Sequence, residues 1–219
     1  TVEGKLMPGV AIGDALAFLA AKADEILPDG MNYSYAGQSR QYIEQGNEML
    51  YAMAFALIII FLVLAAQFNT FREPLVILTT FFFSAFGALL ALTFTKMGTI
   101  NIFTQIGLLT LIGLISKHGI LIVEFSNQLQ EKEGLSVYDA VIKASTMRLR
   151  PILMTTAAMV FGMMPLLFST MGLVQSQFQL ALTIIAGMLV GTSFTIFVVP
   201  ALYYLVAKDK RISNIPEID

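Results

Sequence analysis

The sequence predicts an α-helical integral membrane protein with five transmembrane helices. Hydrophobic residues make up 57% of its 219 positions and charged residues only 13%, whereas soluble domains carry roughly 25% charge. Five separate apolar segments are each long enough to cross a hydrocarbon layer of about 30 Å. Lys and Arg also concentrate in the connections that alternating spans would place on one side of the membrane.

The composition excludes several classes of function. The net charge of −2 provides no basic face for nucleic acid. The chain has no cysteine and a single histidine, which excludes disulfides, cysteine-bound metals and a histidine cluster within the chain. The sequence contains no Walker motif and no nucleophile–histidine pair. We therefore expect neither enzymatic activity nor a bound cofactor.

The first 47 residues are more polar than the rest and predict a β-α-β unit. Its strands would cover residues 1–6 and 31–35, and its helix residues 15–27 with Asp14 as N-cap. A unit of this size is too small to hold a core alone. Because the chain also begins without Met, we expect a C-terminal fragment of a longer polypeptide, whose soluble domain ends in this unit.

Residues 48–206 form the predicted transmembrane domain. The five spans are predicted at residues 48–67, 74–95, 102–123, 151–169 and 178–206. Between the third and fourth spans, residues 135–147 have an amphipathic pattern typical of a helix on the membrane surface. Residues 207–219 are the predicted C-terminal tail.

The basic residues predict the orientation in the membrane. If residue 1 lies outside the cytoplasm, the outer short loops carry only Lys96. The inner connections then carry Arg72, Lys132, Lys143, Arg148, Arg150, Lys208, Lys210 and Arg211. The polar unit 1–47 is therefore expected outside the cytoplasm, and the amphipathic helix and the tail on the cytoplasmic side.

Lys117 is the most informative residue, because it lies within the apolar run 106–123. Its nearest acid, Glu124, is seven residues on, about 10 Å along a helix, and beyond Glu48, the first residue of the first span, no Asp or Glu falls inside a predicted span. A charged lysine near a bilayer centre costs at least about 2.5 kcal/mol. It could form a structural ion pair with an absent helix, or respond to an absent acid that is protonated and released during transport. Intramembrane charges favour the second interpretation.

Each of the other polar residues near Lys117 could have either a structural or a functional role. His118 points about 100° away from Lys117 around the helix. Its imidazole could bind and release a proton, or it could be a packed side chain, which is the commoner case. Thr155 and Thr156 suit a proton wire, although such hydroxyls most often bond to their own helix. Positive-inside anchoring explains Arg148 and Arg150 without further chemistry.

Glycine and methionine indicate packing. Gly187 and Gly191 form a G-x-x-x-G pattern that can seat a neighbouring helix closely. Gly107, Gly113 and Gly119 suggest tight packing around Lys117. The twelve methionines are better explained as packing residues than as a path for soft metal ions.

Two motifs resemble one family closely. Residues 107–125 and 147–156 are similar to two successive late helices of the resistance–nodulation–division (RND) multidrug efflux transporters, in their hydrophobe/amphiphile efflux branch. The similarity extends over essentially the whole chain. It includes residues 27–30 with Gly37, residues 65–68 with Pro74, and residues 131–134.

The resemblance implies that the chain contains the last five of twelve transmembrane helices, after the end of a periplasmic porter subdomain. By motif, it places Lys117, Arg148 and Thr155 in a proton relay with two aspartates of the absent N-terminal part. It implies a homotrimeric antiporter in the inner membrane of a Gram-negative bacterium, where proton influx drives export of amphiphilic drugs. The implied partners are a periplasmic adaptor and an outer-membrane channel. His118 stands where asparagine is common in this family.

Two alternatives to drug export stay open at the level of the sequence. An RND-type exporter of another branch would carry metal ions or lipids. A non-transporting helical scaffold would be expected to work with leucine at position 117, and the cost of keeping Lys117 in the membrane argues against it.

Overall fold

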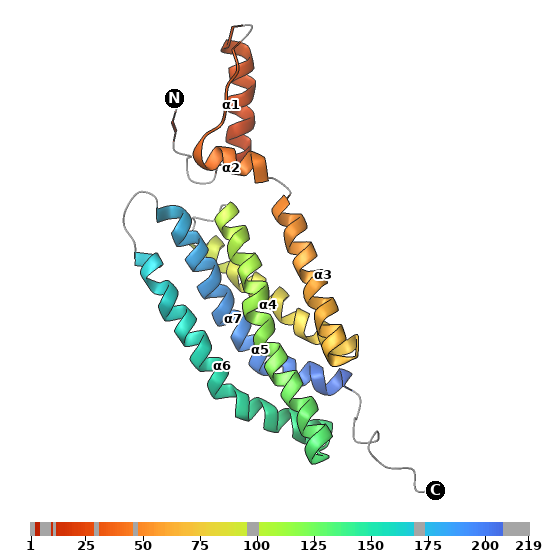
Figure 1. Cartoon of the computed structure of the whole chain (residues 1–219). Coiled ribbons are helices and arrows are strands. Elements are labelled where there is room, and N and C mark those ends of the chain that lie inside the picture. Colours follow the sequence, from red (N-terminus) through yellow and green to blue (C-terminus); the bar gives the residue numbers. More distant parts are fainter. Residues whose placement is uncertain are drawn as a thin grey trace.

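The structure, a computed structural model, describes residues 3–4, 10, 12–28, 31–45, 48–95, 101–168 and 174–207. The regular secondary structure of these residues is entirely α-helical. Five long helices form a bundle, and two shorter helices lie at one end of it (Figure 1). The helices are α1 (Ile12–Ile26), α2 (Gly37–Gln45), α3 (Glu48–Phe68), α4 (Arg72–Phe94), α5 (Ile102–Glu133), α6 (Val137–Phe168) and α7 (Val174–Val206).

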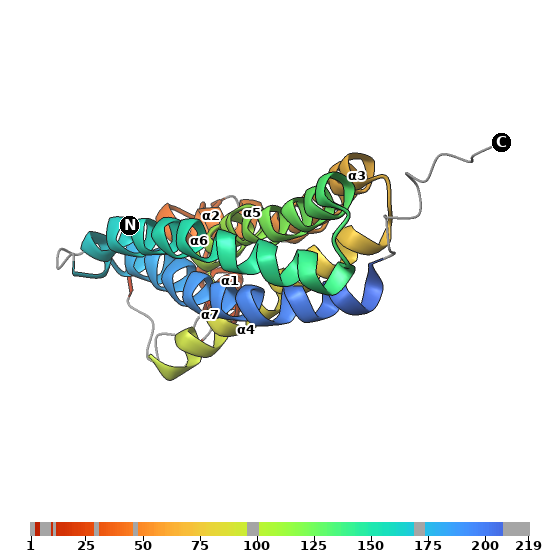
Figure 2. The same ribbon diagram turned by 90° about the horizontal axis from the view of Figure 1, so that it is seen from below.

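The five long helices agree with the predicted class of fold. Within the described residues, α3 to α7 are the helices that are long and apolar enough to cross a membrane. Successive helices run in opposite directions, and α6 and α7 lie side by side along the bundle (Figure 2). The prediction of a helical membrane protein with five spans is confirmed at this level.

Two helices are longer than the sequence indicated. α5 continues ten residues past the expected end at 123 and stops at Gly134, whose φ of 64° suits glycine. α6 is one helix where a surface helix and a separate span were expected. Pro151 lies inside α6, where it removes one backbone hydrogen bond without ending the helix. α6 changes direction along its length (Figure 1), as a helix with an internal proline often does.

The polar unit at the start of the chain is only partly as predicted. α1 corresponds to the expected helix, and Leu16 is its buried residue. Residues 31–36 have no regular secondary structure where a strand was expected, and α2, which follows them, was not predicted. The first predicted strand lies mostly outside the described residues. A strand needs a partner for its backbone hydrogen bonds, and none is found within the described part of the unit.

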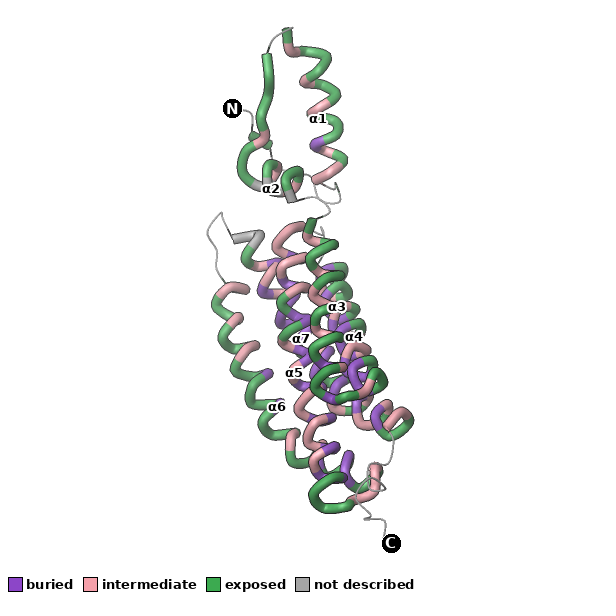
Figure 3. Tube along the Cα trace, turned by 45° about the vertical axis from the view of Figure 1, so that its right-hand side comes forward, coloured by how far each residue is buried: buried purple, intermediate pink, exposed green. Residues whose placement is uncertain are grey.

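The core of the bundle lies among α4, α5 and α7. Of the residues in the most apolar stretch of each helix, 44% are buried in α4, 56% in α5 and 44% in α7. The corresponding shares are 6% in α3 and 11% in α6. Figure 3 shows buried residues concentrated in the three central helices and exposed residues on the two outer ones. α3 and α6 therefore present apolar faces outward, as helices in contact with lipid or with further helices do.

Glycines allow the central helices to approach closely. A methyl group at Gly191 would lie 2.7 Å from the Cβ of Ser84 in α4, and one at Gly187 would overlap Leu111 of α5. The predicted close seat at the G-x-x-x-G pattern is thus confirmed. Gly107 and Gly119 also lie at helix contacts, whereas Gly113 has no described neighbour within 4 Å. The expectation of tight packing at Gly113 is therefore wrong within the described residues.

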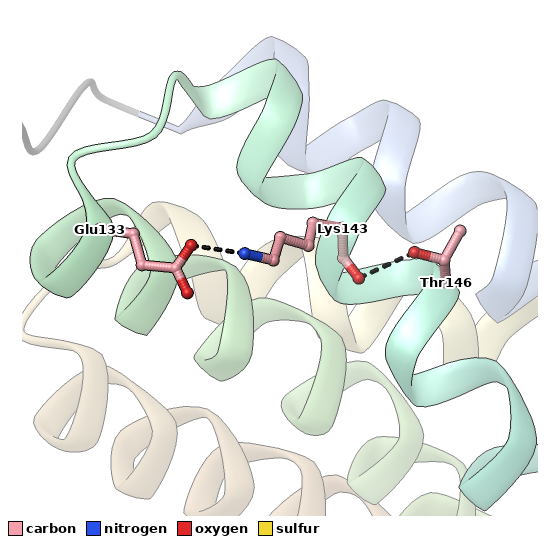
Figure 4. A network of polar contacts seen from close by, with 3 residues as sticks. All are labelled: Glu133, Lys143 and Thr146. Atoms are coloured by element: carbon pink, nitrogen blue, oxygen red, sulfur yellow. Dashed lines mark hydrogen bonds and ion pairs between the residues drawn. The ribbon is translucent and has the colours of Figure 1, made fainter.

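A compact corner joins α5 to α6. Ser136 caps α6, since its Oγ accepts a hydrogen bond of 3.1 Å from the backbone N–H of Asp139. Across the corner, Lys143 forms an ion pair with Glu133, and Thr146 Oγ1 donates to the carbonyl of Lys143 (Figure 4). Because both charged side chains are half-exposed, the pair contributes at most about 1 kcal/mol.

Candidate functional site

Lys117 lies on the least covered side of α5. Its neighbours Ser116 and His118 are buried in the bundle, whereas Lys117 is half-buried. Gly113 and Thr110, one and two turns earlier on the same side, are exposed. Lys117 forms no hydrogen bond or ion pair with any residue that the structure describes. The amine is therefore directed to a side of α5 that these helices leave open.

Thr155 faces α5 from α6. Its hydroxyl donates to the carbonyl of Ile152 at 3.0 Å, which confirms the expected bond to its own helix. Its Oγ1 also lies 3.3 Å from Nε2 of His118. Since the hydroxyl hydrogen is used by Ile152, this second bond requires a hydrogen on Nε2 of His118. His118 is fully buried, and its Nδ1 has no hydrogen-bond partner among the described residues.

The two neighbouring threonines have different surroundings. Thr156 is buried, bonds to the carbonyl of Ile152 at 2.9 Å and lies 3.1 Å from the hydroxyl of Thr192 in α7. Thr155 is exposed apart from its contact with His118. Thr156 therefore joins α6 to α7, and Thr155 joins α6 to the segment of α5 that carries Lys117.

The two arginines also differ. Arg148 is half-buried, and its guanidinium carbon lies 4.4 Å from the centre of the Phe125 ring in α5. Its Nε is enclosed and has no hydrogen-bond partner in the described part of the chain. Arg150 is exposed. Membrane-surface anchoring therefore suits Arg150, whereas Arg148 packs against the helix that carries Lys117.

These contacts follow one antiparallel register between α5 and α6. His118 faces Thr155, and Phe125 faces Arg148. The two contacts are seven residues, or about 10 Å, apart on each helix. The structure thus brings Thr155 to His118, the neighbour of Lys117 in the chain, and keeps Arg148 two turns away, toward the C-terminal end of α5.

A buried polar cluster at that end was missed by the sequence analysis. Glu73 lies in the first turn of α4, one residue before the predicted span 74–95, and is 3% exposed. Asn127 donates to the Glu73 carboxylate at 2.7 Å, and Tyr203 donates to Asn127 Oδ1 at 2.5 Å. Gln130 donates to the Tyr203 oxygen at 2.8 Å. The spacing of Asn127 and Gln130 on one face of α5 is the sequence signal that could have indicated it.

The family model for the AcrB/AcrD/AcrF family matches residues 1–207. The chain belongs to this family. This confirms the resemblance to RND multidrug efflux transporters that the two helix motifs indicated.

Several relatives share this similarity. The chain is 44% identical over 210 residues to an uncharacterized transporter of Haemophilus influenzae. It is 36% identical over 207 residues to the solvent-resistant pump membrane transporter SrpB of Pseudomonas putida, and 35% identical over 207 residues to the multidrug export protein AcrF of Escherichia coli. Each match covers 94% of this chain and 20% of the relative. The chain therefore spans about a fifth of the length of these relatives.

Proposed function

We propose that this chain is the C-terminal membrane segment of an inner-membrane proton/drug antiporter that exports amphiphilic compounds. Relatives of similar identity are named as a solvent-resistant pump, a toluene efflux pump and a multidrug export protein. In this proposal α3 to α7 are the last five of twelve helices. The unit 1–47 is the end of a periplasmic porter subdomain, and residues 207–219 are a cytoplasmic tail.

The position of Lys117 carries the proposal. An amine within a membrane helix requires a counter-charge, and the described helices provide none within hydrogen-bond distance. Lys117 also lies on the side of α5 that is left open at Gly113. Both observations support a partner helix, in the N-terminal part of the transporter, that brings carboxylates to Lys117.

The proposed mechanism is a change in the charge that holds Lys117. Carboxylates close to Lys117 favour its charged form. When a proton entering from the periplasm neutralises one carboxylate, the attraction weakens and the lysine side chain is released. α5 then shifts relative to the partner helices. Thr155 provides a hydroxyl beside this position, and Arg148 a fixed positive charge on the cytoplasmic side of it.

This movement must reach the extracytoplasmic part of the transporter. α3 begins three residues after the end of α2, so a displacement of α3 is passed to the polar unit over a short connection. We propose that the complete protein works as a homotrimer with a periplasmic adaptor and an outer-membrane channel, in a Gram-negative bacterium.

The proposal is tested by replacing Lys117 in a full-length transporter that carries this sequence. Lys117→Met keeps an unbranched side chain and removes the charge. We expect export of a fluorescent amphiphilic dye to be lost, at matched expression and with normal trimer assembly. Export at the wild-type rate would contradict the proposal.

A further inference from the structure

Phe125 makes the clearest contact between Arg148 and the rest of the bundle. The guanidinium carbon lies 4.4 Å from the ring centre, well within the distance of about 6 Å over which an aromatic ring attracts a cation. The ring comes from α5 and the arginine from α6. The interaction therefore joins a charged group of the proposed relay to the helix that carries Lys117.

The other interactions of Arg148 do not fix its side chain. It forms no ion pair with a described residue. The Nε atom of its guanidinium group is buried and has no hydrogen-bond partner in the described part of the chain. The Phe125 ring thus holds the guanidinium against α5, while the terminal N–H groups stay available to an acceptor.

The ring also affects how far the charge acts. An aromatic surface over one face of the guanidinium removes water from that face, and a charge is screened less where water is excluded. Without the ring, the long arginine side chain is free to turn toward solvent. Phe125 therefore controls both the place and the effective strength of this positive charge.

We propose that Phe125 is a positioning residue of the transporter, which holds Arg148 against α5 so that its charge acts on the relay. This inference rests on the proposed function, in which Arg148 belongs to that relay. The shared register supports it, since the same packing of α5 on α6 places His118 against Thr155. Phe125 does not itself exchange a proton.

The test compares Phe125 variants in a full-length transporter that carries this sequence. Phe125→Leu removes the ring, Phe125→Tyr retains it, and Arg148→Ala removes the charge. Export of a fluorescent dye is measured across a series of external pH values, at matched expression. We expect Phe125→Leu to lower the export rate about fivefold, the effect of losing one partly desolvated cation–π contact. It should also shift the pH profile in the same direction as Arg148→Ala, whereas Phe125→Tyr should behave as wild type.

The outcomes separate this inference from the proposed function. If Arg148→Ala exports normally, the proposed role of Arg148 is wrong and the inference falls with it. If Arg148→Ala lowers export and shifts its pH profile while Phe125→Leu keeps the wild-type rate and pH profile, the role of Arg148 stands and the positioning role is overturned. A lowered rate with an unchanged pH profile would also overturn it, because lost packing alone explains that result. If Phe125→Leu does not assemble, Phe125→Met is used in the same comparison.

Discussion

The hydroxyl of Ser84 in α4 donates a 2.8 Å hydrogen bond to the backbone carbonyl of Gly187 in α7, 103 residues later in the chain. A side chain reaches a helical carbonyl on another helix only where the two helices are very close, and the lack of a Cβ at Gly191, where an added methyl would meet Ser84, allows this. Gly191, one turn later, also lies against Ser84. The two helices therefore form the closely packed centre on which α5 and α6 are positioned.

Gly191→Ala should destabilise this centre. The added methyl would lie 2.7 Å from the Cβ of Ser84, an atom bonded directly to the backbone and unable to move alone. We expect a loss of about 1–3 kcal/mol, as for other overpacked cores, measured by thermal unfolding of the full-length protein in detergent. Gly162→Ala is the matched control, since no described atom lies within 4 Å of its added methyl. Equal stability of the two variants would contradict the proposed close seat.

Tyr203→Phe should weaken the buried polar cluster. The change removes the hydroxyl that donates to Asn127 and accepts from Gln130. Buried groups that lose a partner cost about 1–3 kcal/mol, so the melting temperature of the full-length protein should fall. Tyr204→Phe, at a neighbouring exposed position, should change stability little. If both substitutions have the same effect, the cluster does not stabilise the bundle.

Substitutions of Thr155 and Thr156 in α6 should affect different properties, transport for Thr155 and stability for Thr156. Thr155→Val removes a hydroxyl that faces His118, and we expect a large loss of dye export with little change in melting temperature. Thr156→Val removes the contact with Thr192 inside the bundle, and we expect lower stability by about 1 kcal/mol with export retained. Thr155→Ser, which keeps a hydroxyl, should export normally. The reverse pattern would show that Thr156, and not Thr155, is the residue needed for coupling.

His118 should act through its Nε2–H group. The structure requires this hydrogen for the contact with Thr155. Glutamine can place an amide N–H at a similar reach, so His118→Gln should retain dye export, whereas His118→Leu should reduce it. A reduced rate for both variants, at normal expression, would instead indicate that the imidazole is needed for its ability to bind and release a proton.

Features that depend on neighbouring residues in the chain could be predicted from the sequence. Apolar length predicts the five spans, and a charge within such a run makes Lys117 visible. The sequence could not separate Arg148 from Arg150, because the difference arises from the packing of Phe125 on α6. Nor did it indicate that Glu73 is buried, since its partner Asn127 lies 54 residues away in the chain. Tertiary contacts of this kind also explain why α5 extends beyond its apolar part.

The continuous helix α6 illustrates a second limit of sequence analysis. A surface helix and a span meet there at Pro151, and a proline more often marks a helix boundary than an interior position. The backbone nevertheless continues without a break from Val137 to Phe168. As a result, Arg148 and Thr155 lie on one continuous helix, on either side of Pro151.

The most direct test of the account is to measure proton movement that depends on a transported drug. A full-length transporter carrying this sequence is placed in liposomes with a pH-sensitive dye inside, a pH gradient is imposed, and an amphiphilic drug is added. For wild type we predict a drug-dependent proton flux, and for Lys117→Met, with drug binding intact, we predict none. If Lys117→Met moves as many protons per drug molecule as wild type, Lys117 does not couple the two movements and the central claim is wrong.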